Sequence, residues 1–292
     1  MTPIPLTDVE KIRRLPWLIA ADTLNTGFFL LTFTGSVFIL FLNELGLNKS
    51  QIGFLLSLVP FCGIIAPFIA PYLARWGYKR VYVTFWGVRN FVFALILFTP
   101  LILAQYGPVS AFYWVAAIIF GFAMCRAIAE TGGYPWRKEA VPDSIRGKFS
   151  AVNSMSTTVA AIIVIAGASL VIDAGTGLGR FMLLMSVGII LGLASVWSYA
   201  QVPGGAPIKH DSPASTHARA LKGALLDRSF VRFLLVLGLA TVGGTSVISF
   251  VPLYNDRGGR SERRQRGAAQ YRHLYWGLVD FLLVGLAGGP LR

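Results

Sequence analysis

Four side chains within long apolar segments have types and spacings suited to chemistry. Asp22 and Asn25 lie in the first apolar segment, and Arg126 and Glu130 follow the apolar run AFYWVAAIIFGFAMC. Arg126 and Glu130 are four residues apart, so they share one helix face and can partly neutralise each other. A charge in hydrocarbon costs about 2.5 kcal/mol or more on insertion scales, so such residues usually face a protein interior or a water-filled cavity. The pattern therefore indicates a solute or proton pathway.

Each of these residues also has a structural alternative. Asp22 is either the protonatable residue of a proton-driven carrier or part of an ion pair that holds helices together. Arg126 either binds an anionic solute or forms a structural pair with Glu130. Glu130 lies nearer the cytoplasmic end of its helix, so a gate or a helix-end pair suits Glu130 better than contact with the solute. Arg89 and Asn90 occupy the third apolar segment, where a structural hydrogen bond of Arg89 is expected because long basic side chains pair readily.

The composition is that of an integral membrane protein. The 292 residues are 55% hydrophobic and 13% charged, whereas soluble domains contain about 25% charged residues. The net charge of +13 is assigned to cytoplasmic loops and to contact with anionic lipid, not to nucleic acid. Two cysteines in apolar segments and three scattered histidines predict no structural disulfide, no metal site and no cofactor.

The hydropathy pattern predicts an all-α transmembrane fold. Because a span needs about 20 mostly apolar residues, we expect spans at 16–42, 51–74, 81–104, 110–131, 151–173, 178–200 and 230–254. The fourth should end at the Gly132-Gly133 pair, and the sixth holds Gly188 and Gly192 in a spacing that permits close helix contact. The expected organisation is an N-terminus (1–15), a six-helix bundle (16–200), a linker (201–229), a seventh helix (230–254) and a basic tail (255–292).

The basic residues predict the orientation. The N-terminus and three alternate connections hold fifteen Lys and Arg, whereas the other three connections hold two. Basic loops stay in the cytoplasm, so this asymmetry predicts a cytoplasmic N-terminus and linker in a bacterial-type inner membrane.

The tail, residues 255–292, departs from this charge pattern. Its first part, 255–272, contains six arginines and no lysine, and it should lie outside by the alternation above. It is a disordered basic tail, a marginal eighth span or a frameshifted end. The closing VGLAGGPLR can be encoded by codons whose next frame reads W-G-W-L-A-D-R-Y-G. Together with the arginines on the disfavoured side, this favours a frameshift and a sequence that is not native.

Three motifs resemble the major facilitator superfamily over about residues 10–254. The turn APYLARWGYKR is similar to the family's G-x-x-x-D-R-x-G-R-R, with Ala70 and Ala74 in place of the glycine and the aspartate. RAIAETGG, from Arg126, is similar to R-x-x-Q-G in the fourth helix, and PDSIRGK resembles P-x-x-x-R-G at the start of the fifth. The alternate frame of the tail would repeat the first motif. The matching positions are Arg75, Gly77, Lys79 and Arg80 in the turn, and Pro142, Arg146 and Gly147 before the fifth span.

The resemblance implies a carrier of two six-helix bundles, each built from inverted three-helix repeats, with the solute near the midplane between them. It places Asp22, Asn25, Arg126 and Glu130 on the first and fourth helices, which line that cavity. Because the motif's aspartate is missing, the turn at Gly77 is assigned only a topological role as a positive-inside anchor. The third helix, with Arg89, packs outside the cavity.

The expected function is secondary active transport of a small solute by alternating access, with proton coupling and oligomeric state left open. The present chain is expected to be an incomplete copy with little activity alone. A half-carrier that works as a homo-oligomer is the alternative. A membrane-embedded enzyme is disfavoured because no histidine lies in a predicted span. The expected partners are the lipid bilayer and an unidentified small molecule.

Overall fold

The fold is helical throughout the part of the chain that the structure, a computed structural model, describes. That part comprises residues 7–33, 36–207 and, within 226–239, all residues except 230, 234 and 237. The chain divides into two compact units, Met1–Ala218 and Arg219–Arg292. No strand occurs among the described residues, and the predicted all-α transmembrane class is confirmed. The basic tail and most of the predicted linker and seventh helix lie outside the described residues.

The first three helices correspond to the first two predicted spans. Helix α1 (Asp8–Thr32) begins eight residues before the predicted start, with Asp8 and Glu10 in its first turn, where acidic side chains interact favourably with the helix dipole. Helix α2 (Ser36–Glu44) completes the span. Helix α3 (Lys49–Cys62) starts at a reciprocal capping box in which the Asn48 side chain accepts from the Gln51 amide and the Gln51 side chain accepts from the Asn48 amide.

The second span is bent at its prolines. Pro60 lies in the last turn of α3 and Pro67 in the first turn of α4 (Ala66–Trp76), and the 3-10 turn η1 (Gly63–Ile65) joins the two helices. Proline removes a backbone donor and clashes with the preceding turn, so a straight α-helix does not continue through this region. Helix α4 ends at Gly77, whose φ of 91° reverses the chain into α5 (Tyr78–Ala94).

The remaining elements follow in alternating directions. The 3-10 turn η2 (Leu95–Phe98) links α5 to α6 (Thr99–Ala140), and η3 (Asp143–Ile145) links α6 to α7 (Arg146–Ala174), which precedes α8 (Gly179–Ala200). The segment Tyr78–Ala140 is 63 residues long, or about 95 Å of helix, whereas the hydrocarbon core is about 30 Å thick. It reverses at Gly107, where φ is 78° and ψ 178°, so it contains two crossings.

The described bundle therefore has six crossings. Of its five apolar helical stretches, Tyr78–Ala140 crosses twice and each of the other four crosses once. The predicted end of the fourth span at Gly132-Gly133 is wrong, since α6 continues to Ala140. The two glycines serve packing instead. A Cβ atom on Gly132 would lie 3.1 Å from the Tyr78 carbonyl oxygen, and one on Gly133 would lie 2.7 Å from the Tyr82 ring.

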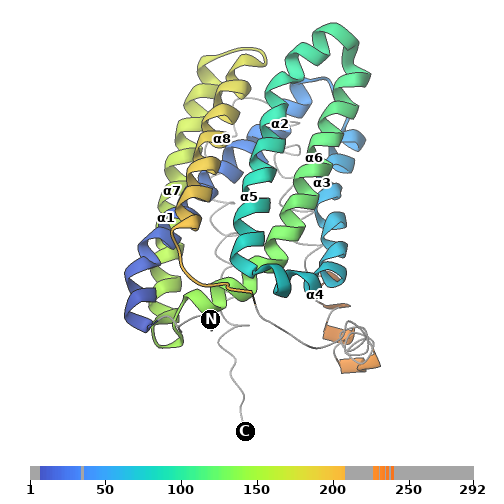
Figure 1. Ribbon diagram of the computed structural model, residues 1–292. Helices are drawn as coiled ribbons and strands as arrows, with labels where there is room; N and C mark the ends of the chain where they lie inside the picture. Colours follow the sequence, from blue (N-terminus) through green and yellow to red (C-terminus); the bar gives the residue numbers. More distant parts are fainter. Residues whose placement is uncertain are drawn as a thin grey trace. The chain divides into compact units, whose positions relative to one another are not determined.

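The helix contacts have the symmetry of an inverted repeat. Helix α1 packs against α8 and α7, while α6 packs against α5 and the bent pair α3 and α4, and α5 meets α8 between the two groups (Figure 1). Exchanging the first three spans with the last three maps each of these contacts onto another. The two groups stand side by side in Figure 1, with α1, α7 and α8 in one and α3, α5 and α6 in the other. This is the predicted 3+3 arrangement, in which α1 and α6 are equivalent.

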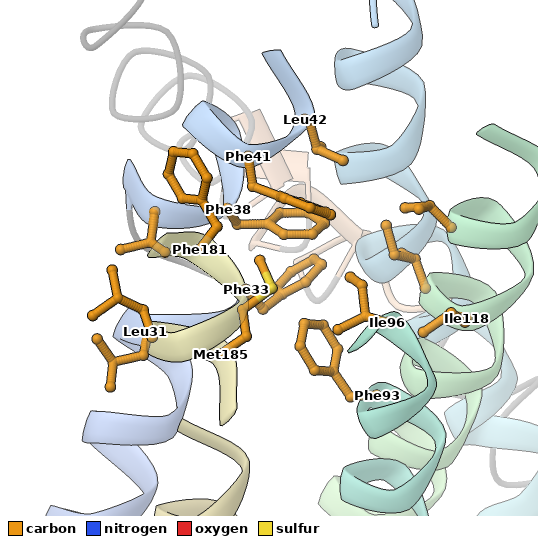
Figure 2. Packing of buried hydrophobic residues seen from close by; sticks show 14 of the residues in the cluster. Leu31, Phe33, Phe38, Phe41, Leu42, Phe93, Ile96, Ile118, Phe181 and Met185 are labelled. Carbon is orange, nitrogen blue, oxygen red and sulfur yellow. The ribbon is translucent and has the colours of Figure 1, made fainter. Parts of the chain in front are cut away.

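Two apolar clusters fill the bundle. The larger contains seven buried phenylalanines and draws on α1, α2, α3, α5, α6, α7 and α8. Figure 2 shows Phe38, Phe41 and Phe93 converging with Met185. In a bilayer the lipid is as apolar as these side chains, so close packing rather than exclusion from water holds the helices together. Gly188 and Gly192 show this requirement, because Cβ atoms there would lie 2.7 Å from Thr32 and 2.6 Å from the Phe28 ring.

Candidate functional site

Asp22 is the centre of a polar cluster at the end of the bundle where α6 and α8 terminate. Its side chain is 9% exposed and forms a bidentate ion pair with Arg137, in which Nη2 donates to Oδ1 at 2.6 Å and Nη1 donates to Oδ2 at 3.0 Å. Bidentate pairing matches the planar guanidinium to the carboxylate and is the stronger form of such a contact. This geometry favours the ion-pair alternative for Asp22.

Three further side chains complete this group, which we call the Asp22 cluster. Tyr199 of α8 donates to Asp22 Oδ1 at 2.5 Å, and Asn153 of α7 donates to Oδ2 at 3.0 Å. Arg137 also donates to the Tyr199 and Tyr82 hydroxyls, at 2.9 and 3.3 Å. The carboxylate of α1 thus contacts α6, α7 and α8 at one point, and Arg137 extends the cluster to α5 through the Tyr82 hydroxyl.

A surface groove of about 680 Å³ adjoins this cluster. Arg137 and Asn153 line it together with Lys138, Arg146 and Phe149, so it lies between the end of α6 and the start of α7. Arg137 is 35% exposed, whereas Asp22 lies behind it. The cationic member of the pair is therefore the one that meets water, and screening by water reduces the strength of the pair.

Arg89 occupies an aromatic box halfway along α5. Its guanidinium carbon lies 3.3 Å from the centre of the Trp86 ring, and the rings of Phe28, Phe29 and Phe122 surround it within 5.4 Å. Arg89 is fully buried. It donates to Asn25 Oδ1 from Nη2 at 2.7 Å and to Asn90 Oδ1 from Nε at 3.3 Å. Cation–π contacts with desolvated rings, worth about 2 kcal/mol, offset part of the cost of burying this charge.

The Arg89 site has more hydrogen-bond donors than acceptors among the described residues. Among the described residues, no carboxylate forms an ion pair with Arg89. Arg89 Nη1, Asn90 Nδ2 and Trp86 Nε1 are buried and have no partner in the described part of the chain. All three atoms are donors, and all three residues lie within two turns of α5. A Cβ atom on Gly192 would lie 3.0 Å from Asn90 Nδ2, so α8 presents only backbone here.

Arg126 and Glu130 form the expected i,i+4 pair on α6. Arg126 Nε lies 2.8 Å from Glu130 Oε1, and the two side chains are 28% and 36% exposed. The Arg126 guanidinium carbon also lies 5.0 Å from the centre of the Phe29 ring, which is 4.8 Å from that of Arg89. Phe29 of α1 thus contacts both guanidinium groups, and it connects the Arg126–Glu130 pair to the Arg89 site.

The loop motif around Gly77 is held by the last residue of α8 and by the chain that follows it. We call residues 201–207 the strap. Lys79 Nζ donates to the Ala200 carbonyl at 2.8 Å, Trp136 Nε1 donates to the Pro203 carbonyl at 3.2 Å, and the Gly205 amide donates to Glu139 Oε2 at 3.0 Å. A Cβ atom on Gly77 would lie 3.1 Å from the Gly205 carbonyl oxygen. Gly77 is therefore needed both for its positive φ and for contact with the strap.

The other motif residues lie outside these contacts. Arg75 and Arg80 are exposed at the two sides of the Gly77 turn. Pro142 is buried before η3, Arg146 pairs with Asp143 at the surface, and Gly147 has open space around it. In the described part of the chain, none of these five residues forms a hydrogen bond or an ion pair with Asp22 or Arg89.

Sequence reasoning missed four members of the Asp22 cluster, which are Arg137, Tyr199, Asn153 and Tyr82. Arg137 lies beyond the helix end that was expected at Gly132-Gly133, but it occupies the last turn of α6. Tyr199 and Asn153 carried no charge signal. The sequence did contain an indication of Arg137. If the helix continues past Gly133, Arg137 lies three turns beyond Arg126 and reaches the end of the bundle where Asp22 lies.

The fold and these ion pairs define a class: an integral membrane protein whose six-span bundle keeps charged groups between its helices. A model of the Major Facilitator Superfamily matches residues 23–291. The chain belongs to this superfamily, and it is therefore a membrane transporter. Comparisons with curated proteins and with solved structures gave no match. The match extends through the tail, whose predicted frameshift stays a prediction.

Proposed function

We propose that this chain carries a small solute across a bacterial-type inner membrane by alternating access, with its N-terminus in the cytoplasm. The observation that carries the proposal is the set of polar groups between α1 and α6. Asn25 on α1 and Arg126 and Glu130 on α6 are partly exposed, although apolar residues surround them along both helices. In carriers built from inverted repeats the solute binds between such helices at the midplane.

The Asp22 cluster acts in this mechanism as a clamp. It ties α1 to four other helices near the end of the bundle. Alternating access by rocking requires each bundle to move as one body around the bound solute. The clamp keeps the bundle rigid, while Asn25, Arg126 and Glu130 contact the solute.

Reconstitution into proteoliposomes tests the transport proposal. We expect saturable uptake of at least one solute from a panel of sugars, amino acids, carboxylates and organic cations, at a low rate because little activity is expected of this chain alone. Arg126→Gln should abolish that uptake, whereas the control Arg146→Gln, which changes an exposed arginine outside the bundle's interior, should not. Absence of uptake across the panel, or equal uptake by the two variants, would contradict the proposal.

Cysteine labelling tests the orientation. Asp8 and Asn43 lie at opposite ends of the first span and are both exposed. In a background with Cys62 and Cys125 replaced by alanine, Asn43→Cys should react with a membrane-impermeant maleimide on intact cells. Asp8→Cys should react only after the membrane is opened, and the reverse pattern would overturn the orientation.

A second candidate is a half-carrier that works as a homo-oligomer. Helix α7 favours it, because Ala168 is its only buried residue within the described structure, and Ser150, Ser154 and Thr158 form an exposed polar row at four-residue spacing. A polar row on a spanning helix suits contact with a second bundle better than contact with lipid. Ser154→Cys should then form crosslinked dimers in membranes, and a monomer at all crosslinker lengths would exclude this candidate.

A further inference from the structure

The interior of the bundle has an unbalanced positive charge. Asp22 pairs with Arg137 and Glu130 pairs with Arg126, so both of these pairs are neutral. Arg89 has no acidic partner among the described residues. The three buried donors without acceptors, Arg89 Nη1, Asn90 Nδ2 and Trp86 Nε1, lie at the same place. Among the described residues, the site therefore has no negative charge and has fewer hydrogen-bond acceptors than donors.

Arg89 also determines what Asn25 presents to the solute. Arginine is a donor only, and its Nη2 occupies the oxygen of the Asn25 amide at 2.7 Å. The Asn25 amide is thereby fixed with Nδ2 free, because Nδ2 has no hydrogen bond to any described residue and is not among the buried atoms. Asn25 is partly exposed, so it offers a donor rather than an acceptor to a bound molecule.

Arg126 adds further donors beside Asn25. It uses only Nε for Glu130, so both of its Nη groups have no described hydrogen-bond partner. Phe29, one turn after Asn25, lies within 5.0 Å of the guanidinium groups of Arg126 and Arg89. The guanidinium groups of Arg126 and Arg89 thus lie against one ring, and Arg89 connects this ring to Asn25 by its hydrogen bond.

We propose that this site binds the anionic group of the solute, a carboxylate or a group of similar charge and size. Asn25 Nδ2 and the Arg126 Nη groups contact the anion. Arg89 is a positioning residue that orients Asn25 and supplies the balancing charge from within the bundle. The inference rests on the proposed transport function and names its substrate class.

Asn25→Asp tests the proposal without enlarging or emptying the site. The new carboxylate has the shape of the amide and lies where Arg89 already donates, so it supplies the missing charge internally. Asn48→Asp is the matched control, because it makes the same chemical change at an exposed helix cap, where aspartate is equally suitable. The probes are acetate, succinate and benzoate, each paired with its neutral amide, and binding is followed by tryptophan fluorescence of the full chain in detergent.

The native chain and Asn48→Asp should bind at least one carboxylate at least tenfold more tightly than its amide. Asn25→Asp should bind that carboxylate at least tenfold more weakly than the native chain does, while its unfolding temperature stays the same or rises. Equal binding of carboxylates and amides, or native carboxylate affinity in Asn25→Asp, would overturn the proposal. Transport confined to neutral or cationic solutes would overturn the anion site but not the proposed transport function. Absence of all transport would overturn the proposed function, and carboxylate binding in detergent would then still test the anion site.

Discussion

Replacement of Asp22 by asparagine should destabilise the bundle more than any other single change to a charged residue at this end. The carboxylate accepts four hydrogen bonds from Arg137, Tyr199 and Asn153. An asparagine keeps one acceptor oxygen but places an NH₂ group against donors. Removal of one partner of a buried ion pair costs about 3–5 kcal/mol. Because Arg137 is 35% exposed, we expect the lower end, about 3 kcal/mol.

The assay is thermal unfolding in detergent, followed by circular dichroism. A loss of about 3 kcal/mol should lower the midpoint by about 6–12 °C for a bundle of this size. The single variants Asp22→Asn and Arg137→Gln should each be destabilised, and the double variant should be less destabilised than the sum by about 2 kcal/mol, because the two residues share contacts. Arg146→Gln, which breaks the exposed pair with Asp143, should change stability by less than about 0.5 kcal/mol.

The reasoning would be refuted by an Asp22→Asn midpoint within about 1 °C of the native value. Additive effects of the two single changes would also refute it, because they would show that Asp22 and Arg137 stabilise the bundle independently. Transport that falls together with the midpoint would agree with the clamp, whereas activity lost without any change in midpoint would indicate a direct role of Asp22 in transport.

Three other changes have defined outcomes. Gly192→Ala should lower the unfolding midpoint by several degrees, since its Cβ atom would lie 2.6 Å from the Phe28 ring, whereas Gly167→Ala, with open space around it, should leave the midpoint unchanged or raise it. Gly205→Ala should detach the strap, because φ is 70° there and a Cβ atom would lie 2.5 Å from the Lys79 amide nitrogen; faster proteolysis after α8 would report this, and unchanged cleavage would count against it. Glu130→Gln should remove any dependence of uptake on a proton gradient if this half-exposed carboxylate is the coupling group, with persistent dependence as the contrary result.

The helices and their order could be predicted from the sequence because each crossing of the hydrocarbon core requires a long apolar segment. Such segments make up most of residues 16–200. The ends of the helices depend on tertiary packing and were less predictable. The Gly132-Gly133 pair has the composition of a helix terminator, but the structure uses both glycines to bring α6 against Tyr78 and Tyr82. One misplaced helix end concealed Arg137, and with it the partner of Asp22.

In the candidate site, too, some residues could be predicted from the sequence and others could not. Asp22, Asn25, Arg126 and Glu130 were identifiable because charged and amide groups are rare within spans. The i,i+4 spacing also predicted which partner Arg126 would find. Partners on other helices, such as Tyr199 for Asp22 and Asn25 for Arg89, depend on how α8 and α5 are rotated against α1. A single sequence gives no information on that rotation, so the donor-rich environment of Arg89 emerged only from the structure.

The strap makes residues 201–207 part of the bundle rather than of the connection that follows it. Pro203 and Gly205 are bound to α6 by hydrogen bonds, and Gly205 also lies against Gly77. Seven extended residues could span about 25 Å, but these seven are used for contacts with the bundle. Chimeras that exchange the connection after α8 should therefore be joined after residue 207, because an exchange made at residue 201 would remove the contacts of the Gly77 turn.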